Sequence, residues 1–354
     1  MRRSARSPAR TTRRPARSWL WRLTLFMMAL LTGAALGMVW WTWRSLQPIA
    51  NHGERVIFEV EEGQNLRQIA RELQGAGLIS NARVFCWGVE RWGLAEQLKH
   101  GHYELAPSMS PRAIAEKIAR GEVVVRKVTI PEGFTIDQIA ARLEAEEVCE
   151  AESFAKLARY ESFDELMGME RPKSGWEGYL FPKTYTMPYR AKARVAITML
   201  LEQFLAEIEP LRPAIEQGKL GLHGVVTLAS LVEREARLDE ERPVIASVYY
   251  NRLDRGMKLQ CDATVVYAWA RRGVQKTRLL YSDLTIDSPY NTYMHPGLPV
   301  GPIASPGLKS LEAAVHPDTT DYLYYVARGD GSHVFTKTEA QHEAAKRRVR
   351  AGRG

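Results

Sequence analysis

The sequence predicts an α+β protein with a single transmembrane helix, a small α+β subdomain and a larger mixed α+β domain. Three observations predict this fold class. An uncharged stretch of 21 residues is long enough to cross a bilayer, two segments 70 residues apart repeat a strand–turn–helix pattern, and strand-like and helix-like segments alternate irregularly afterwards. A chain of 354 residues with 45% hydrophobic and 25% charged residues is not wholly disordered.

The net charge of +8 belongs to one end of the chain. Residues 1–22 contain eight arginines and no acidic residue, so the remainder is neutral. Nucleic-acid-binding proteins carry a basic surface on the folded body, which this chain lacks. The charge distribution therefore argues against a nucleic-acid partner.

Residues 23–43 carry no charge, and tryptophans stand at both edges of this stretch. A helix of this length spans a hydrocarbon core of about 30 Å. The arginines before it predict a cytoplasmic N-terminus, with the rest of the chain outside the plasma (inner) membrane. The alternative is a cleaved signal peptide, but the stretch is long and no small-x-small cleavage pattern follows.

The transmembrane stretch and the repeat divide the chain into six parts. Residues 1–22 are expected to form a basic tail, 23–43 the helix, 44–55 a linker, 56–125 the small subdomain, 126–345 the larger domain and 346–354 a basic C-terminal tail.

The cysteines and histidines indicate neither a disulfide framework nor a metal site. Cys86, Cys149 and Cys261 are odd in number and widely spaced, and the histidines lack ligand spacing. We expect buried thiols, no metal and no cofactor.

The repeated pattern predicts two helix starts. Residues 60–70 and 130–140 align, and each has a Gly turn followed by a polar N-cap, Asn65 or Thr135. A fainter copy follows residue 103, where Ser110 precedes Pro111.

This strand–turn–helix unit resembles the LysM module, which binds glycans that contain N-acetylglucosamine. The resemblance implies a LysM-like subdomain with a glycan-binding surface. The alternative is a generic α+β unit whose apolar residues are only core.

In the larger domain the pattern predicts short strands and longer helices, separated by Pro/Gly-rich segments at 171–189 and 287–307. Loops of that length often form a site. The expected strands are 123–130, 322–327 and 333–336, and the expected helices are 136–147, 153–160, 191–208, 224–238, 242–254 and 308–314.

The helix expected at 224–238 carries the strongest catalytic candidate. Glu235 continues an apolar stripe, whereas Glu233 points away from it; the stripe comprises Val225, Leu228, Leu231 and Val232. A carboxyl group on an apolar face has a raised pKa and stays protonated, as a general acid requires. The alternative is that Glu235 lies past the buried turns, paired with one of three nearby arginines.

Polar residues further along suit a ligand rich in hydroxyls and amides. The alternation around Gln260, Asp262 and Thr264 predicts a strand-like stretch with all three on one face. The Pro/Gly run at 297–307 predicts a rigid groove wall. The alternative for these residues is turn chemistry. The further polar candidates here are Asn291, Thr292, Tyr293 and Ser305.

Several motifs together resemble the endolytic murein transglycosylases, the MltG or YceG-like family. They include Ser-x-x-Glu-x-Glu at 230–235 and Glu-Gly-Tyr-Leu-Phe-Pro at 177–182, and the similarity covers about residues 56–345. The segments that carry the rest are 241–242, 246–253, 256–262, 291–307, 316–317 and 322–326.

The resemblance implies that Glu235 is the catalytic acid, because the family's acid is the second Glu of its motif. It implies a lytic reaction on peptidoglycan that leaves a 1,6-anhydro-N-acetylmuramic end and terminates strand elongation, with peptidoglycan synthases as candidate partners. This chain departs from the family at 261–263. The substrate-binding candidates are Glu177, Tyr179, Glu233, Gln260, Asp262, Thr264, Asn291, Thr292, Tyr293 and Ser305.

Two other functional classes match parts of the sequence. Ser153 and Lys156 match S-x-x-K of serine acyl-enzymes, but the accompanying Lys-Thr-Gly and Ser-Asp-Asn motifs are missing, and Ser153 suits an N-cap better. A non-enzymatic, membrane-tethered peptidoglycan-binding protein would need only the anchor and the LysM-like unit.

Overall fold

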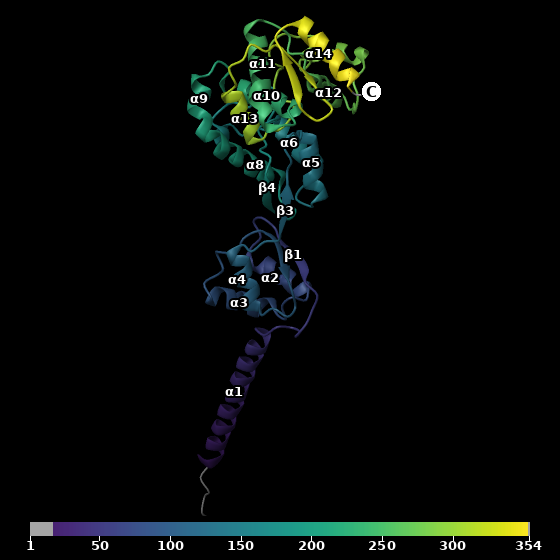
Figure 1. Ribbon diagram of the computed structural model, residues 1–354. Helices are drawn as coiled ribbons and strands as arrows, with labels where there is room; N and C mark the ends of the chain where they lie inside the picture. The colour runs from purple at the N-terminus through teal and green to yellow at the C-terminus, as the bar shows by residue number, and fades with distance from the viewer. Residues whose placement is uncertain (1–16, 353–354) are drawn as a thin grey trace, which may run out of the picture. The chain divides into compact units, whose positions relative to one another are not determined.

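The computed structural model describes residues 17–352, and its contacts divide the chain into two compact units, Met1–Val124 and Val125–Gly354 (Figure 1). The mixed α+β class predicted from the sequence is confirmed. Most of the arginine-rich tail, residues 1–16, lies outside the described residues.

The first unit begins with a long apolar helix, α1 (Arg17–Ser45), drawn as one continuous rod in Figure 1. Its part from Trp19 to Ser45 is long enough to cross a membrane and contains an 18-residue stretch with a mean hydropathy of 1.9. A membrane anchor and a signal sequence both meet this description.

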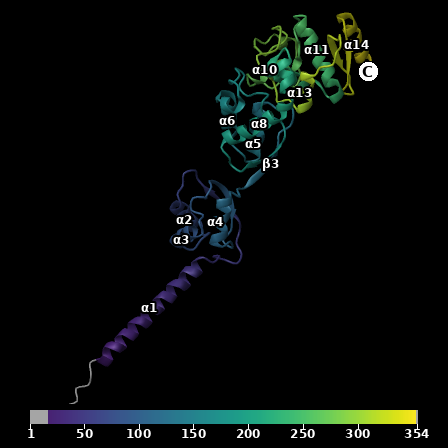
Figure 2. The ribbon, with the colours of Figure 1, turned by 90° about the vertical axis from the view of Figure 1, so that its left-hand side faces the viewer.

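The rest of the first unit contains one pair of strands and three helices, which are labelled α2, α3 and α4 in Figure 2. β1 (Val56–Val60) and β2 (Gly101–Leu105) are antiparallel, with Val56 opposite Leu105. The helices are α2 (Leu66–Gly75), α3 (Ala82–Arg91) and α4 (Pro111–Arg120), and their core includes Ile69, Leu73, Phe85, Tyr103 and Ile114.

The helix starts predicted from the repeat are confirmed. Asn65 caps α2, and its side chain accepts a hydrogen bond from Gln68 N at 3.0 Å while Gln68 Oε1 accepts from Asn65 N at 2.9 Å. Thr135 and Gln138 form the same reciprocal capping box in the second unit. Ser110 caps α4 directly before Pro111.

The second unit contains two antiparallel strand pairs among many helices. β3 (Val125–Thr129) pairs with β4 (Thr184–Pro188), and β5 (Tyr324–Ala327) pairs with β6 (His333–Thr336). Its helical elements are α5 (Ile136–Ala145), α6 (Ala151–Tyr160), α7 (Asp164–Met167), α8 (Ala193–Ile208), η1 (Glu209–Leu211), α9 (Arg212–Gln217), α10 (Gly221–Glu235), η2 (Asp239–Glu241), α11 (Arg242–Asp254), α12 (Asp262–Ala270), η3 (Tyr281–Thr285), α13 (Leu308–Val315) and α14 (Glu339–Ala351).

Helix α10 is the central element of this unit. Every residue from 225 to 232 is buried, so the helix is enclosed on all sides rather than along one stripe. Helices α11 and α13 pack against it and against each other (Figure 1). The hydroxyls of Thr227 and Ser230 donate to backbone carbonyls one turn earlier, which satisfies them inside this apolar core.

Three expectations about local structure were wrong. The stretch around residues 260–264 is not a strand: Gln260 has a φ of 50°, and α12 begins at Asp262. A two-residue alternation over so few positions does not exclude a helix start. Ser153 is not an N-cap, because Glu150 holds that position before α6. Residues 346–351 belong to α14 rather than to a tail.

Candidate functional site

A cavity of about 700 Å³ lies in the second unit, and Glu235 is part of its wall. Three other residues singled out from the sequence also line it: Gln260, Asp262 and Tyr293. Most of the remaining wall comes from the β5–β6 hairpin, η3 and its flanking residues, and α14, and Arg252 of α11 and Leu259 complete it. The cavity therefore joins segments separated by more than a hundred positions in the chain.

Glu235 is the last residue of α10, and Ala236 after it is extended. Its side chain is partly buried, and its Oε1 accepts a hydrogen bond from the Cys261 thiol at 3.3 Å. Burial raises the pKa of the Glu235 carboxyl, and the nearby Asp262 carboxylate raises it further. The negative end of the helix dipole also disfavours a carboxylate here.

Hydroxyl and thiol groups around Glu235 stay protonated. Burial raises the pKa of the Cys261 thiol and of the Tyr325 hydroxyl well above their ordinary values. Tyr325 and Tyr249 share a hydrogen bond of 2.9 Å between their hydroxyls. Hydrogen bonding from Cys261 and Tyr325 lowers the pKa of Glu235, but burial outweighs it.

No arginine or lysine in the described part of the chain forms an ion pair with Glu235. Arg242, one of the arginines considered as its partner, pairs with Glu233 instead at 3.1 Å. Glu235 thus combines a wall position in a cavity with a carboxyl group that favours its protonated form. That combination suits proton donation to a bound ligand.

Asp262 and Tyr293 form a polar pair on the same wall. The Tyr293 hydroxyl donates to Asp262 Oδ1 at 2.5 Å, and Asp262 itself is exposed. Gln260 is also exposed, and its backbone N donates to Thr292 O at 3.2 Å. These side chains present hydrogen-bonding groups to whatever fills the cavity.

Three of the predicted polar residues are buried beneath the cavity wall and hydrogen-bond to the segments that form it. Thr264 and Thr292 are buried and share a hydrogen bond of 2.9 Å, and Thr292 Oγ1 accepts from Cys261 N at 3.0 Å. Asn291 is also buried, and its amide donates to the carbonyls of Leu284 and Ile286. None of the three lines the cavity.

Glu177 and Tyr179 also lie in the interior rather than on the cavity wall. Glu177 accepts hydrogen bonds from Ile136 N at 3.0 Å and from the Tyr267 hydroxyl at 2.8 Å, and burial raises its pKa to about 7. The Tyr179 hydroxyl is 3.0 Å from His223 Nδ1. Between them, Gly178 has a φ of 83° and lies so close to Pro302 that a Cβ would collide.

The Pro/Gly run at 297–307 packs beside α10, and the prediction that it forms a groove wall was wrong for this cavity. Ile303 N donates to Ser230 Oγ at 3.1 Å, which ties the run to the helix. Ser305 is fully buried, and its backbone N donates to Phe134 O at 2.8 Å. The run therefore contacts α10, and none of its residues lines this cavity.

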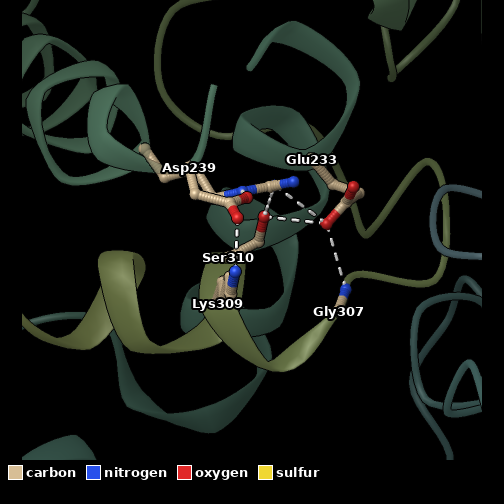
Figure 3. A network of polar contacts seen from close by, with 6 residues as sticks. Glu233, Asp239, Gly307, Lys309 and Ser310 are labelled. Carbon is tan, nitrogen blue, oxygen red and sulfur yellow. Dashed lines mark hydrogen bonds and ion pairs between the residues drawn. The ribbon is translucent and has the colours of Figure 1, made fainter. Parts of the chain in front are cut away.

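Glu233 anchors the end of α10 through the network shown in Figure 3. Its Oε2 accepts from Arg242 Nη1 at 3.1 Å, Ser310 Oγ at 2.8 Å and Gly307 N at 3.1 Å. Asp239 completes the network with ion pairs to Arg242, at 3.1 Å, and to Lys309. These contacts join the end of α10 to the starts of α11 and α13, two residues before Glu235.

Several cavity residues were missed by the sequence analysis. They include Tyr281, which is 90% exposed in η3, and His333 and His342, which lie far along the chain. Strand periodicity places His333 on one face of β6, but no local pattern indicates that His333 lines the same cavity as Glu235. The sequence analysis expected Cys261 to be a buried thiol but did not predict its contact with Glu235.

The cysteines are free thiols. Cys261 is buried as expected, whereas Cys86 and Cys149 are partly exposed. Among residues 17–352, no group of three or more His, Cys, Asp and Glu side chains is arranged to hold a metal ion.

Comparisons with known proteins agree on one family. The model of the YceG-like family matches residues 58–348. A Bacillus subtilis protein named endolytic murein transglycosylase is 37% identical over 319 residues, which cover 85% of this chain and 87% of that protein. A Streptococcus pneumoniae protein of the same name is 32% identical over 351 residues, covering 90% of this chain but 63% of that protein.

A solved structure supports the same relationship. The crystal structure of a yceG-like protein from Listeria monocytogenes matches with a TM-score of 0.56 and 35% identity. The match covers 82% of this chain and 98% of that one.

Proposed function

The chain belongs to the YceG-like family, and from that membership we propose that it is a membrane-anchored lytic transglycosylase of peptidoglycan. It cleaves glycan strands internally between N-acetylmuramic acid and N-acetylglucosamine and leaves a 1,6-anhydro-N-acetylmuramic end. The observation that carries this proposal is Glu235, a carboxyl group with a raised pKa in the wall of a cavity. A protein that only binds glycan has no need of such a group.

In the proposed reaction Glu235 acts twice. Its carboxyl protonates the glycosidic oxygen as the bond from that oxygen to C1 of N-acetylmuramic acid breaks. The C6 hydroxyl of the same sugar then attacks C1, and the Glu235 carboxylate takes the proton from that hydroxyl. One protein carboxyl suffices because the nucleophile belongs to the substrate, unlike the two-carboxylate scheme of hydrolytic glycosidases. Intramolecular attack also gives a high effective concentration of the nucleophile.

The neighbouring residues suit a sugar substrate. Gln260, Asp262 and Tyr293 offer donors and acceptors to hydroxyl and amide groups along the cavity wall. Tyr281 places an exposed aromatic ring at the same cavity, where it can stack on a sugar ring. A 1,6-anhydro end has no leaving group at C1, so a strand that ends in this way cannot be extended from that end.

The function is tested by incubating the purified full-length protein with isolated peptidoglycan and identifying the products by mass spectrometry. We expect long soluble fragments first, with ends lighter by one water than hydrolysis products. Products with ordinary reducing ends would show a hydrolase instead. Glycan binding without any cleavage would favour the non-enzymatic alternative.

We further propose that α1 is retained as an anchor, with the N-terminus in the cytoplasm. Arginines on one side of the apolar stretch support this orientation. A reporter enzyme that is active only outside the cytoplasm, fused after Gly354, is expected to be active in intact cells. Activity of a cytoplasmic reporter at the same position would contradict the orientation, and release of the shortened chain from the membrane would show a signal peptide.

We also propose that residues 56–122 are a LysM-like unit that holds glycan without taking part in the chemistry. A cavity of about 360 Å³ beside the turn after β1 supports this, with Gln64, Ile69 and His100 in its wall. Deleting residues 56–122 is expected to weaken peptidoglycan binding while residual cleavage remains, as measured by sedimentation with peptidoglycan and by product release. Unchanged binding by the folded deletion variant would make this unit a spacer.

A further inference from the structure

His333, which lines the same cavity as Glu235, is paired with a carboxylate. His333 at the start of β6 and Glu241 at the end of η2 are 92 positions apart in the chain. Glu241 Oε2 is 2.6 Å from His333 Nδ1, and Glu241 Oε1 accepts from His333 N at 2.9 Å. One carboxylate thus holds both the ring and the backbone of His333.

The pair is almost fully enclosed. The exposed fractions of the two side chains are 4% for His333 and 13% for Glu241. Because a carboxylate can only accept a hydrogen bond, the proton of this contact belongs to Nδ1 of the imidazole. The Tyr325 ring meets the imidazole edge-on, with 5.3 Å between ring centroids. Contacts of this kind fix the orientation of the ring.

His333 also acts electrostatically on Glu235. A positive charge on its imidazole lowers the pKa of the Glu235 carboxyl, against the effect of burial. Both residues line the same cavity. The Tyr325 ring, which touches His333, carries a hydroxyl that also hydrogen-bonds to Glu235.

We propose that His333, oriented by Glu241, is a positioning residue whose protonated imidazole stabilises the carboxylate that Glu235 becomes after it donates its proton. This inference rests on the proposed function of Glu235. A positive imidazole near Glu235 makes release of the proton from Glu235 easier, whereas burial of Glu235 opposes that release. Because Glu241 holds the imidazole, the ring is oriented before the reaction and needs no rearrangement.

The titratable groups around Glu235 come from several elements: α14 contributes Glu339, His342, Glu343 and Lys346 to the same cavity, and α11 contributes Arg252. The groups facing Glu235 are Cys261 and Asp262 at the start of α12, Tyr325 of β5, Tyr249 of α11, Tyr293 and His333. Burial raises the pKa of the thiol and of the three hydroxyls, which therefore remain neutral. Glu241 is the charged group that contacts His333 directly. A pH profile between pH 4 and pH 9 therefore reflects the carboxyl groups of the cavity and its two histidines, His333 and His342, and the His333→Gln variant isolates the contribution of His333.

The test compares pH profiles of kcat/KM for the full-length wild type, His333→Gln and Glu241→Gln. Without the imidazole charge the pKa of Glu235 rises, so Glu235 stays protonated to higher pH. The alkaline limb is expected to move upward by about half a unit or more in His333→Gln, and kcat at pH 6 to fall about three- to tenfold with KM nearly unchanged. Glu241→Gln is expected to shift the limb in the same direction by less. His316→Gln, which removes an exposed histidine, is the matched control with a wild-type profile.

A second measurement separates this inference from the proposed function. Titration of ¹³C-carboxyl-labelled glutamates by NMR, with Glu235→Gln to assign the signal, gives the pKa of Glu235 without any turnover. A higher pKa of Glu235 in His333→Gln supports the inference even if the wild type releases no anhydro product. An unchanged pKa and pH profile, with only a lower melting temperature, would overturn it and leave His333 a structural residue.

Discussion

Replacing Glu235 by glutamine is expected to reduce the release of anhydro products by about 10²–10⁴-fold, the usual loss on removing a general acid. The effect can exceed this range because the same group is proposed to act as acid and then as base. Glutamine keeps the size of the side chain and can still accept a hydrogen bond from the Cys261 thiol. It cannot supply the proton that the leaving oxygen requires.

The measurement is product release by mass spectrometry, with thermal unfolding of the same samples alongside. Folding should survive, because a neutral amide is no harder to bury than the protonated acid. Glu233→Gln serves as the comparison within the same motif. It leaves the proposed proton donor in place, so its loss of activity is expected to be much smaller and to come from weaker anchoring of the end of α10 by Arg242 and α13. A near wild-type rate for Glu235→Gln, or inactivity explained only by unfolding, would contradict the assignment.

Replacing Arg242 by methionine is expected to destabilise the second unit by about 3–5 kcal/mol, the usual result of removing one partner of a buried ion pair. The side chains of Arg242 and Glu233 are each 8% exposed. Without Arg242 the Glu233 carboxylate keeps only the hydrogen bonds from Gly307 and Ser310 and has no countercharge there. For a unit of this size the loss corresponds to a melting temperature lower by roughly 10 °C.

The matched control comes from the same network. Lys309→Met removes the other cation that pairs with Asp239, but the Lys309 and Asp239 side chains are 64% and 51% exposed. Solvent screens such a pair, so thermal unfolding should change little. Equal melting temperatures for Arg242→Met and the wild type would show that the buried pair does not stabilise the unit.

Arg242→Met is also expected to lose more activity than the fraction of unfolded protein accounts for. Glu233 lies two residues before Glu235 at the end of α10, and its contacts join that end to α11 and α13. A shift of the last turn would move the Glu235 carboxyl relative to the bound glycan. Small displacements of a catalytic group are costly, because proton transfer needs hydrogen-bond contact.

The helices and their N-caps that depend only on neighbouring residues could be predicted from the sequence alone. The apolar helix α1, the caps at Asn65 and Thr135, and the position of Glu235 near the end of α10 all depend on neighbouring residues. Helix periodicity and capping arise within a few turns, so local sequence carries them. The motif around Glu235 also identified the family, which the comparisons confirmed.

Which polar residues share the cavity was decided by tertiary structure. Gln260, Asp262 and Tyr293 line it, whereas Glu177 and Ser305, equally polar and in equally distinctive motifs, are buried elsewhere. Composition suggests that a residue can bind sugar, but the path of the chain decides whether its side chain reaches the cavity or satisfies backbone groups inside the protein.

The sequence by itself determined the membrane-length helix, the repeated capped helices and the place of Glu235 near the end of α10. Only the tertiary structure brought His333 and Glu241 together across 92 positions and set the Cys261 thiol 3.3 Å from Glu235. The physical reason is that the pKa of Glu235 depends on burial and on charges within a few ångströms, and those neighbours come from segments that are distant in the sequence.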